Sequence, residues 1–385
     1  MRKPKRQAGT SRPTMMDVAA AAGVSQATVS LVLSGSKGAR LAESTRKRVV
    51  EAAEALGYKF VRRGQRSSNG NAMSILFIAD EISADPWMSL AFEGARDRAL
   101  EQGVNLTLGL SHGDPDVETS LVGSAGRQQL AGLIYGTILT RQVQLPEVFS
   151  RHHTVLVNCY DVGRAFSAVL PGDLVGGRAA TEHLIAVGRR RIGYINGQQG
   201  VDAARDRLKG YRQALASADI GFDPALVRPG NWEPSAGYLM TKELMALPNP
   251  PDAIFCANDM MAVGCYDALK ELGKSIPHDV AVIGFDDRDI AQSMHPPLST
   301  LVLPHYEMGR TAVELLLDAV GGQKASPSRT KVECELIIRH STAGRSSPGL
   351  HHSGRLYDSP EPTAASLFGA AEIAEAIERD RDDNE

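Results

Sequence analysis

Three polar side chains lie in short sequence motifs just after the ends of predicted strands. Arg207 lies in AARDRLKGY, Asn258 in ANDMMA and Asp286 in GFDD. A carboxylate accepts hydrogen bonds from hydroxyl groups, whereas a guanidinium and an amide N–H donate them. If these loops converge at the carboxyl ends of parallel strands, the three groups suit a polyhydroxylated small molecule. The alternative for Arg207 is a surface ion pair with its neighbour Asp206.

Catalytic and metal-binding arrangements are poorly supported. Asp286 and Asp287 are adjacent at one strand end, so their carboxylates point in opposite directions and form no acid/base pair without a third partner. The histidine pairs at 152–153 and 351–352 are also adjacent, which is poor geometry for one metal ion. The cysteines at 159, 256, 265 and 334 match no zinc or redox spacing and are predicted to be buried thiols in a reducing compartment. We expect no enzyme activity, no cofactor and no metal.

From residue 73 onward, short apolar runs alternate with helical stretches. The predicted strands are buried on both faces and cover 73–79, 104–110, 132–136, 154–158, 191–197, 253–259 and 280–287. The predicted helices cover about 89–102, 115–129, 176–187, 204–218 and 260–272, the last capped by Asp259. Such repetition implies right-handed βαβ units, and its two sets imply two doubly wound α/β lobes.

The amino-terminal residues predict three short helices instead. Thr14 and Asp17 form a capping box for the first helix, and Gly23 allows a left-handed turn after it. Ser25 caps the second helix, and the third covers about 44–56 and ends at Gly57. The inward face of the second helix is predicted to be Val29, Val32 and Leu33. This is helix-turn-helix construction, in which the second helix enters the DNA major groove.

The net charge of −3 hides a strong asymmetry along the 385 residues. Residues 1–66 carry 14 Lys and Arg against 4 Asp and Glu, whereas the remainder carries 28 against 41. A basic end on an acidic body is typical of a phosphate-binding head. No stretch approaches the roughly 20 apolar residues of a membrane span, and the basic amino terminus lacks the apolar core of a signal peptide. We expect a cytoplasmic protein.

The phrase DVAAAAGVSQATVS, followed by TRKRV and LGY, resembles the DNA-binding headpiece of the lac repressor (LacI/GalR) family. Further phrases, among them GGRAATEHLIAVGRRRIGYING, AIFCANDMMAVG and VAVIGFDD, resemble the effector-binding core of the same family. The resemblance covers about 14–342. It implies a three-helix DNA-binding domain followed by a two-lobed core like that of periplasmic sugar-binding proteins of type I.

The resemblance divides the chain into a basic tail (1–13), the DNA-binding domain (14–59), a hinge (60–72), the core (73–342) and a tail (343–385). Within the core it assigns 73–170 and about 303–330 to lobe 1, and 171–302 and about 333–342 to lobe 2. Relatives place a leucine in the hinge where this chain has Ser67, and Gly64 and Gly70 disfavour helix there. A hinge helix that forms on DNA and a flexible linker both stay open.

On the outer face of the second helix, Gln26 suits adenine N6 and N7, and Ala27 suits a thymine methyl. Leu31 stands where relatives usually have arginine, which implies either an altered operator preference or packing against the third helix. The expected DNA contacts are Thr14, Ser25, Gln26, Ala27, Thr28, Ser30, Leu31, Arg46, Arg62 and Arg63.

The resemblance places effector contacts at Trp87, Arg207, Trp232, Asn258 and Asp286. Core packing is the alternative for both tryptophans. The implied protein is a homodimeric regulator of transcription, most simply a repressor of a pseudo-palindromic operator, controlled by a small carbohydrate effector. A solute-binding module that does not regulate DNA is the second interpretation.

Overall fold

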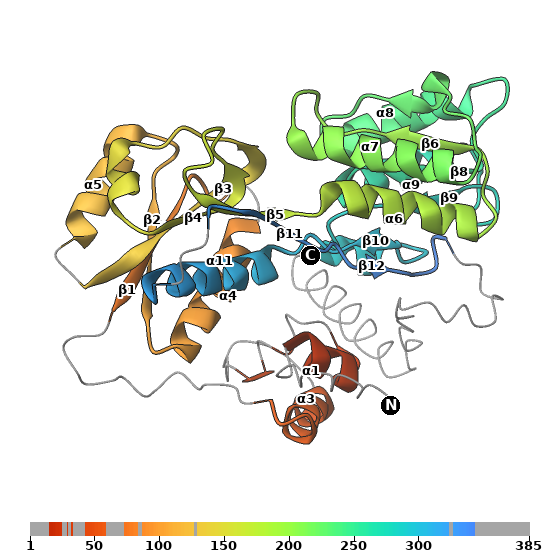
Figure 1. Cartoon of the computed structure of the whole chain (residues 1–385). Helices are drawn as coiled ribbons and strands as arrows, with labels where there is room; N and C mark the ends of the chain where they lie inside the picture. Colours follow the sequence, from red (N-terminus) through yellow and green to blue (C-terminus); the bar gives the residue numbers. More distant parts are fainter. Residues whose placement is uncertain are drawn as a thin grey trace, which may run out of the picture.

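A small helical headpiece and two α/β lobes make up the computed structural model (Figure 1). The structure describes residues 15–24, 29, 32–33, 43–58, 73–83, 87–126, 129–322 and 326–342. None of the helices in these residues combines the length and apolarity that crossing a membrane requires.

The headpiece is built on helices α1 (Met15–Ala22) and α3 (Glu43–Ala55). Its core contains Val18, Val49 and, as predicted, Val29 and Val32. Gly57 has a φ of +67° and ends α3, because its N–H donates to Glu54 O and the N–H of Tyr58 donates to Ala53 O. This is a Schellman motif, which confirms the predicted end of the third helix.

Lobe 1 is a six-stranded, fully parallel sheet in the order β11-β5-β4-β3-β1-β2. Its strands are β1 (Ser74–Ala79), β2 (Asn105–Leu110), β3 (Leu130–Gln142), β4 (Thr154–Tyr160), β5 (Ser167–Pro171) and β11 (Arg329–Val332). Helices α4 (Trp87–Glu101) and α11 (His305–Val320) cover one face, and α5 (Pro115–Ala125) with the 3₁₀ turn Glu147–Arg151 covers the other. Alternate residues of β1 therefore face opposite cores, which explains why this strand is an unbroken apolar run.

Lobe 2 is a smaller parallel sheet in the order β7-β6-β8-β9. Its strands are β6 (Ile192–Ile195), β7 (Val227–Arg228), β8 (Ala253–Cys256) and β9 (Ala281–Ile283). Its helices are α6 (Asp173–Ala186), α7 (Asp202–Ser217), α8 (Pro234–Met245), α9 (Asp259–Glu271) and the short α10 (Asp289–Ser293). The two lobes stand side by side in Figure 1, which confirms the predicted two-lobed α/β fold.

Within the described residues the chain passes between the lobes three times. The crossings lie between β5 and α6, between β10 (Thr300–Leu301) and α11, and between β11 and β12 (Leu336–Ile337). Strands β10 and β12 form an antiparallel pair that joins the last two crossings. The four cysteines are free and buried, as predicted.

Candidate functional site

Arg207 is the centre of the candidate effector site. It lies within α7, not just past a strand end as the sequence pattern predicted, and its side chain is 4% exposed. Its Nε donates to Asp173 Oδ1 over 2.8 Å, its Nη1 donates to the carbonyl of Ala257, and Nη1 lies 3.7 Å from Asp286 Oδ1. Burial alone would lower the pKa of Arg207, but the charges of Asp173 and Asp286 raise it above its ordinary value. Arg207 is therefore not on the surface, and the alternative prediction of a surface ion pair with Asp206 was wrong.

Asp286 and Asp287 follow β9 and diverge, as predicted. Asp286 faces Arg207 and lies 3.9 Å from Arg288 Nε, whereas Asp287 accepts from Arg339 Nη2 over 2.6 Å. Both aspartates have positive φ, +122° for Asp286 and +55° for Asp287. Strained backbone of this kind persists where the surrounding structure enforces it, and it concentrates at binding sites.

Trp232 precedes α8 and also has a positive φ, +73°. Its ring packs on the lobe 2 core, and its centroid lies 5.7 Å from the Arg207 guanidinium. A Cβ at Gly197 would lie 1.9 Å from this ring, so only glycine leaves room for the indole. The indole Nε1 is buried and makes no hydrogen bond.

Asn258 positions Trp232 and starts a helix. Its Oδ1 accepts from Met261 N over 2.9 Å, and its Nδ2 donates to the carbonyl of Trp232 over 3.0 Å. Asn258 is therefore the cap of α9, and the prediction that Asp259 caps this helix was wrong. Asp259 accepts instead from Thr300 Oγ1 and from the backbone N of Arg288, and burial raises its pKa well above the usual range.

Lobe 1 contributes Trp87, the first residue of α4. Its ring stacks on His305, the first residue of α11, with centroids 5.5 Å apart and an interplanar angle of 23°. The guanidinium of Arg288, from lobe 2, lies 5.3 Å from the Trp87 centroid. Contacts thus run from Trp87 through Arg288 and Asp286 to Arg207.

We call this group the interlobe cluster. Its members are Trp87, Asp173, Arg207, Trp232, Asp286, Arg288 and His305. Two of them carry buried polar atoms without a hydrogen-bond partner, namely Asp173 Oδ2 and Trp232 Nε1. Since buried polar atoms in native proteins are nearly always bonded, this concentration makes the cluster the candidate ligand site.

Asp173, Arg288 and His305 were not among the site residues predicted from the sequence. Arg288 stands two residues after Asp286, which was an available signal. Asp173 lies 34 positions before Arg207, and no local pattern joins the two.

Of the expected DNA contacts, only Arg46 falls within the described part of the chain, where it is half-buried on α3. Thr14, Ser25, Gln26, Ala27, Thr28, Ser30, Leu31, Arg62 and Arg63 lie outside the described residues. Their contact with DNA stays a prediction.

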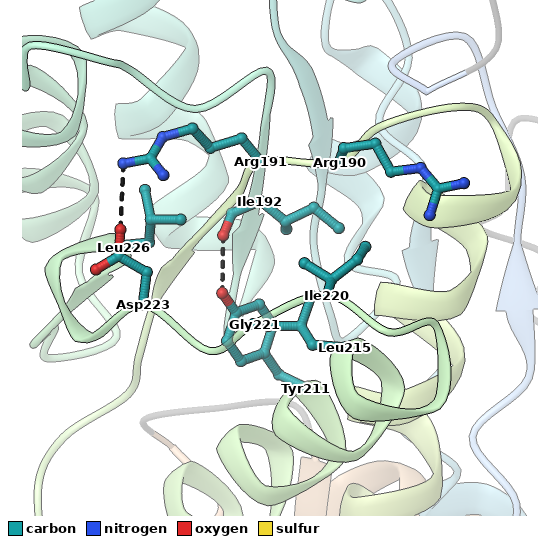
Figure 2. A pocket seen from close by; sticks show the side chains of 9 residues that line it. All are labelled: Arg190, Arg191, Ile192, Tyr211, Leu215, Ile220, Gly221, Asp223 and Leu226. Carbon is teal, nitrogen blue, oxygen red and sulfur yellow. Dashed lines mark hydrogen bonds and ion pairs between the residues drawn. The ribbon is translucent and has the colours of Figure 1, made fainter.

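A cavity of about 160 Å³ opens elsewhere in lobe 2 (Figure 2). It is lined by the residues at the start of β6 and by the segment before β7, so it lies at the amino-terminal edge of the sheet. Arg191 pairs with Asp223 over 3.2 Å, and Tyr211 donates to the carbonyl of Ile192 over 2.8 Å, whereas Arg190 points away (Figure 2). Since the interlobe cluster follows the carboxyl ends of the strands, this cavity is separate from it.

Comparisons with known proteins identify both parts of the chain. Residues 14–59 match the model of the bacterial regulatory proteins of the lacI family, and 181–342 match a periplasmic binding protein-like domain. The HTH-type transcriptional repressor CytR of Escherichia coli (strain K12) is 34% identical over 330 residues, 86% of this chain and 96% of the relative.

Two solved structures resemble the whole arrangement. The transcriptional regulator CelR in complex with cellobiose is 31% identical, covers 86% of this chain and 100% of its own, and has a TM-score of 0.58. The lac repressor dimer bound to operator and the anti-inducer ONPF is 25% identical, covers 86% of this chain and 99% of its own, and has a TM-score of 0.59. The chain therefore belongs to the LacI family of bacterial transcriptional regulators, with a DNA-binding headpiece and an effector-binding core.

Proposed function

We propose that this protein is a cytoplasmic, homodimeric repressor whose operator affinity changes when an uncharged, polyhydroxylated effector such as a sugar binds at the interlobe cluster. The observation that carries the proposal is the concentration of unpartnered buried polar atoms around Arg207. An indole N–H, a carboxylate oxygen and an imidazole are the groups that bind hydroxyls, and the two tryptophans offer faces for stacking on a sugar ring. The cellobiose complex of CelR supports this choice of ligand class.

The mechanism follows from the position of the cluster. Trp87 belongs to lobe 1, whereas Arg207, Trp232 and Asp286 belong to lobe 2, so a ligand held by both groups fixes the angle between the lobes. A change in that angle moves lobe 1, whose first strand, β1, follows the headpiece in the sequence. By linkage, operator binding changes effector affinity by the same factor. The dimer is proposed by analogy with the operator-bound lac repressor dimer.

Two other functions are less well supported. A solute-binding module would not need the basic headpiece that matches the lacI family. An enzyme would need an acid/base pair at the cluster, but Asp286 and Asp287 diverge onto separate arginines, and the two carboxylates of the cluster, Asp173 and Asp286, both face the Arg207 guanidinium. If the protein had either of these two functions, sugars would not change its DNA binding.

The test combines operator discovery with effector screening. Bound sequences are selected from random DNA, and the winner is titrated by fluorescence anisotropy with a panel of sugars present. We expect a palindromic winner that one neutral sugar releases. Asp286→Asn, which keeps the side-chain volume, should bind the same operator but no longer respond. Sequence-independent, salt-sensitive binding without a sugar response would overturn the proposal.

A further inference from the structure

The first turn of α11, in lobe 1, contacts the headpiece. Tyr306, the second residue of α11, packs on the headpiece core, as does Tyr58, which follows the end of α3. Burial raises the pKa of Tyr58 to about 12, and charged side chains of α4 and α11 also act on this phenol. Two tyrosines that are far apart in the sequence therefore join the headpiece to lobe 1.

The ring of Tyr306 is held on a rigid surface. Its hydroxyl donates to Asp97 Oδ2 of α4 over 2.9 Å. A Cβ at Gly94 would lie 1.9 Å from the carbonyl oxygen of Tyr306, and a Cβ at Gly309 would lie 1.9 Å from that of Ala91. Helices α4 and α11 thus pack backbone against backbone, which only glycine permits at these two positions. The first turn of α11 cannot shift on α4 without separating the two helices.

The charged side chains beside Tyr58 are paired with one another. Arg310 Nη1 and Nη2 donate to the two carboxylate oxygens of Glu101 over 3.0 and 3.1 Å. Arg96 Nη2 lies 2.9 Å from Asp97 Oδ1. Because these charges largely compensate each other, they attract the basic headpiece only weakly. The contact therefore depends on burial of the tyrosine rings, which salt does not screen.

We propose that the face of the α4–α11 pair around Tyr306 is a docking surface for this chain's own headpiece, and that it holds the headpiece on lobe 1 without DNA. This inference goes beyond the proposed function, because it needs neither an effector nor an operator. His305, the residue before Tyr306, stacks on Trp87 in the interlobe cluster. The docked headpiece thus contacts the residue next to that cluster.

The first experiment identifies the contact by photochemical cross-linking, which joins phenol rings that lie against each other. Full-length protein without DNA is irradiated with a ruthenium tris-bipyridine complex and persulfate, and joined peptides are identified by mass spectrometry. We expect a peptide that joins Tyr58 to Tyr306, and its loss in Tyr58→Phe. The sample is a mixture of nitrogen-15-labelled and unlabelled protein that has exchanged subunits, so that each joined peptide reports whether both halves come from one chain.

The second experiment measures by hydrogen exchange whether the contact holds the headpiece in place. Tyr306→Ala removes the ring, whereas Tyr306→Phe keeps the ring and loses only the bond to Asp97. The control is Tyr238→Ala in α8, because Tyr238 is also half-buried and its hydroxyl also donates to a carboxylate, that of Glu271. Exchange is followed in the full-length proteins without DNA or sugar.

We expect Tyr306→Ala to speed exchange at the end of α3, at Gly57 and Tyr58, by about tenfold or more, because docking no longer stabilises the headpiece. Tyr306→Phe should stay within about threefold of the wild type, and Tyr238→Ala should leave the headpiece unchanged. In the wild type, raising NaCl from about 0.05 M to about 0.5 M should change these rates little.

Three results would overturn the docking surface. They are the absence of the joined peptide, unchanged headpiece exchange in Tyr306→Ala, and release of the wild-type headpiece by salt. A joined peptide of mixed isotopes would show that the headpiece docks on a second copy and would overturn the assignment to its own chain. If Tyr306→Ala also speeds exchange in β1, lobe 1 has loosened, and the wild-type cross-link, which needs no substitution, decides. None of these results depends on effector binding, so the proposed function stands or falls separately.

Discussion

The phenol of Tyr160 donates a hydrogen bond of 2.6 Å to Asp202 Oδ2 and so joins the two lobes directly. Tyr160 ends β4 of lobe 1, and Asp202 begins α7 of lobe 2, the helix that carries Arg207. Arg205 Nη1 also donates to Asp202 over 2.6 Å, and the Arg329 guanidinium lies 4.1 Å from the Tyr160 centroid. A movement between the lobes must therefore break or bend a hydrogen bond to α7, the helix at the proposed effector site.

The bond between Tyr160 and Asp202 should be measurable as an energetic coupling. We expect Tyr160→Phe and Asp202→Ala to be non-additive by about 1 kcal/mol in the free energy of unfolding, measured by urea denaturation. The cycle is needed because Asp202→Ala also removes the pair with Arg205. Additive losses would mean that the bond contributes nothing in solution.

Gly197→Ala should disable the effector site without contact with DNA. The new Cβ would lie 1.9 Å from the Trp232 ring, so the indole must leave its position. We expect loss of the sugar response, with operator affinity in the absence of sugar near that of the wild type. Gly123→Ala in α5 is the control, because its Cβ would meet no atom within 4 Å, and its response should be unchanged. A normal sugar response of Gly197→Ala would exclude Trp232 from the site.

Acidification should destabilise the protein through two histidines. Burial lowers the pKa of His183 to about 4, and burial with Arg207 lowers that of His305 to about 3. Below the ordinary pKa of 6.5, the unfolded chain binds protons that the folded rings do not, so stability falls as the pH drops.

The size of this effect follows from linkage. From pH 6.5 to pH 5 each ring should cost about 2 kcal/mol. His305→Leu and His183→Leu should each flatten the pH dependence of the unfolding free energy by about that amount. Asp259, whose raised pKa acts in the opposite direction, is common to all three proteins and cancels in the comparison. An unchanged slope in His305→Leu would show that this ring is protonated or solvated in the fold.

The prediction that the headpiece reads bases rests on the sequence alone. It can be tested by comparing a predicted base contact with a predicted phosphate contact. Gln26→Ala should relax the preference at one operator base pair by about 1–3 kcal/mol. Arg46→Ala should instead weaken binding to all sequences and reduce the salt dependence. Competition binding with single-base operator variants measures both. A uniform loss in Gln26→Ala would count against base reading by Gln26.

The sequence by itself determined the family and the two-lobed fold, and it suggested several members of the proposed effector site. The pattern of apolar residues and the signals that cap a helix are local properties of the sequence. The strands at 73–79 and 104–110 and the end of α3 at Gly57 were therefore predictable. Two-residue strands such as β7 and β10 were not, because they are too short to show a period. Helix α11 was not predicted from its own pattern either; its residues pack in the core of lobe 1.

Only the tertiary structure decided which polar groups meet. Either Asn258 or Asp259 could cap α9. Asn258 caps it, because Asp259 accepts hydrogen bonds from Thr300 and Arg288, which are distant in sequence. Distant partners also determine the pairing of Arg207 with Asp173 and the bond from Tyr160 to Asp202. The burial of the His305 ring depends in the same way on what packs around it after folding, since burial is a property of three-dimensional neighbours rather than of local sequence.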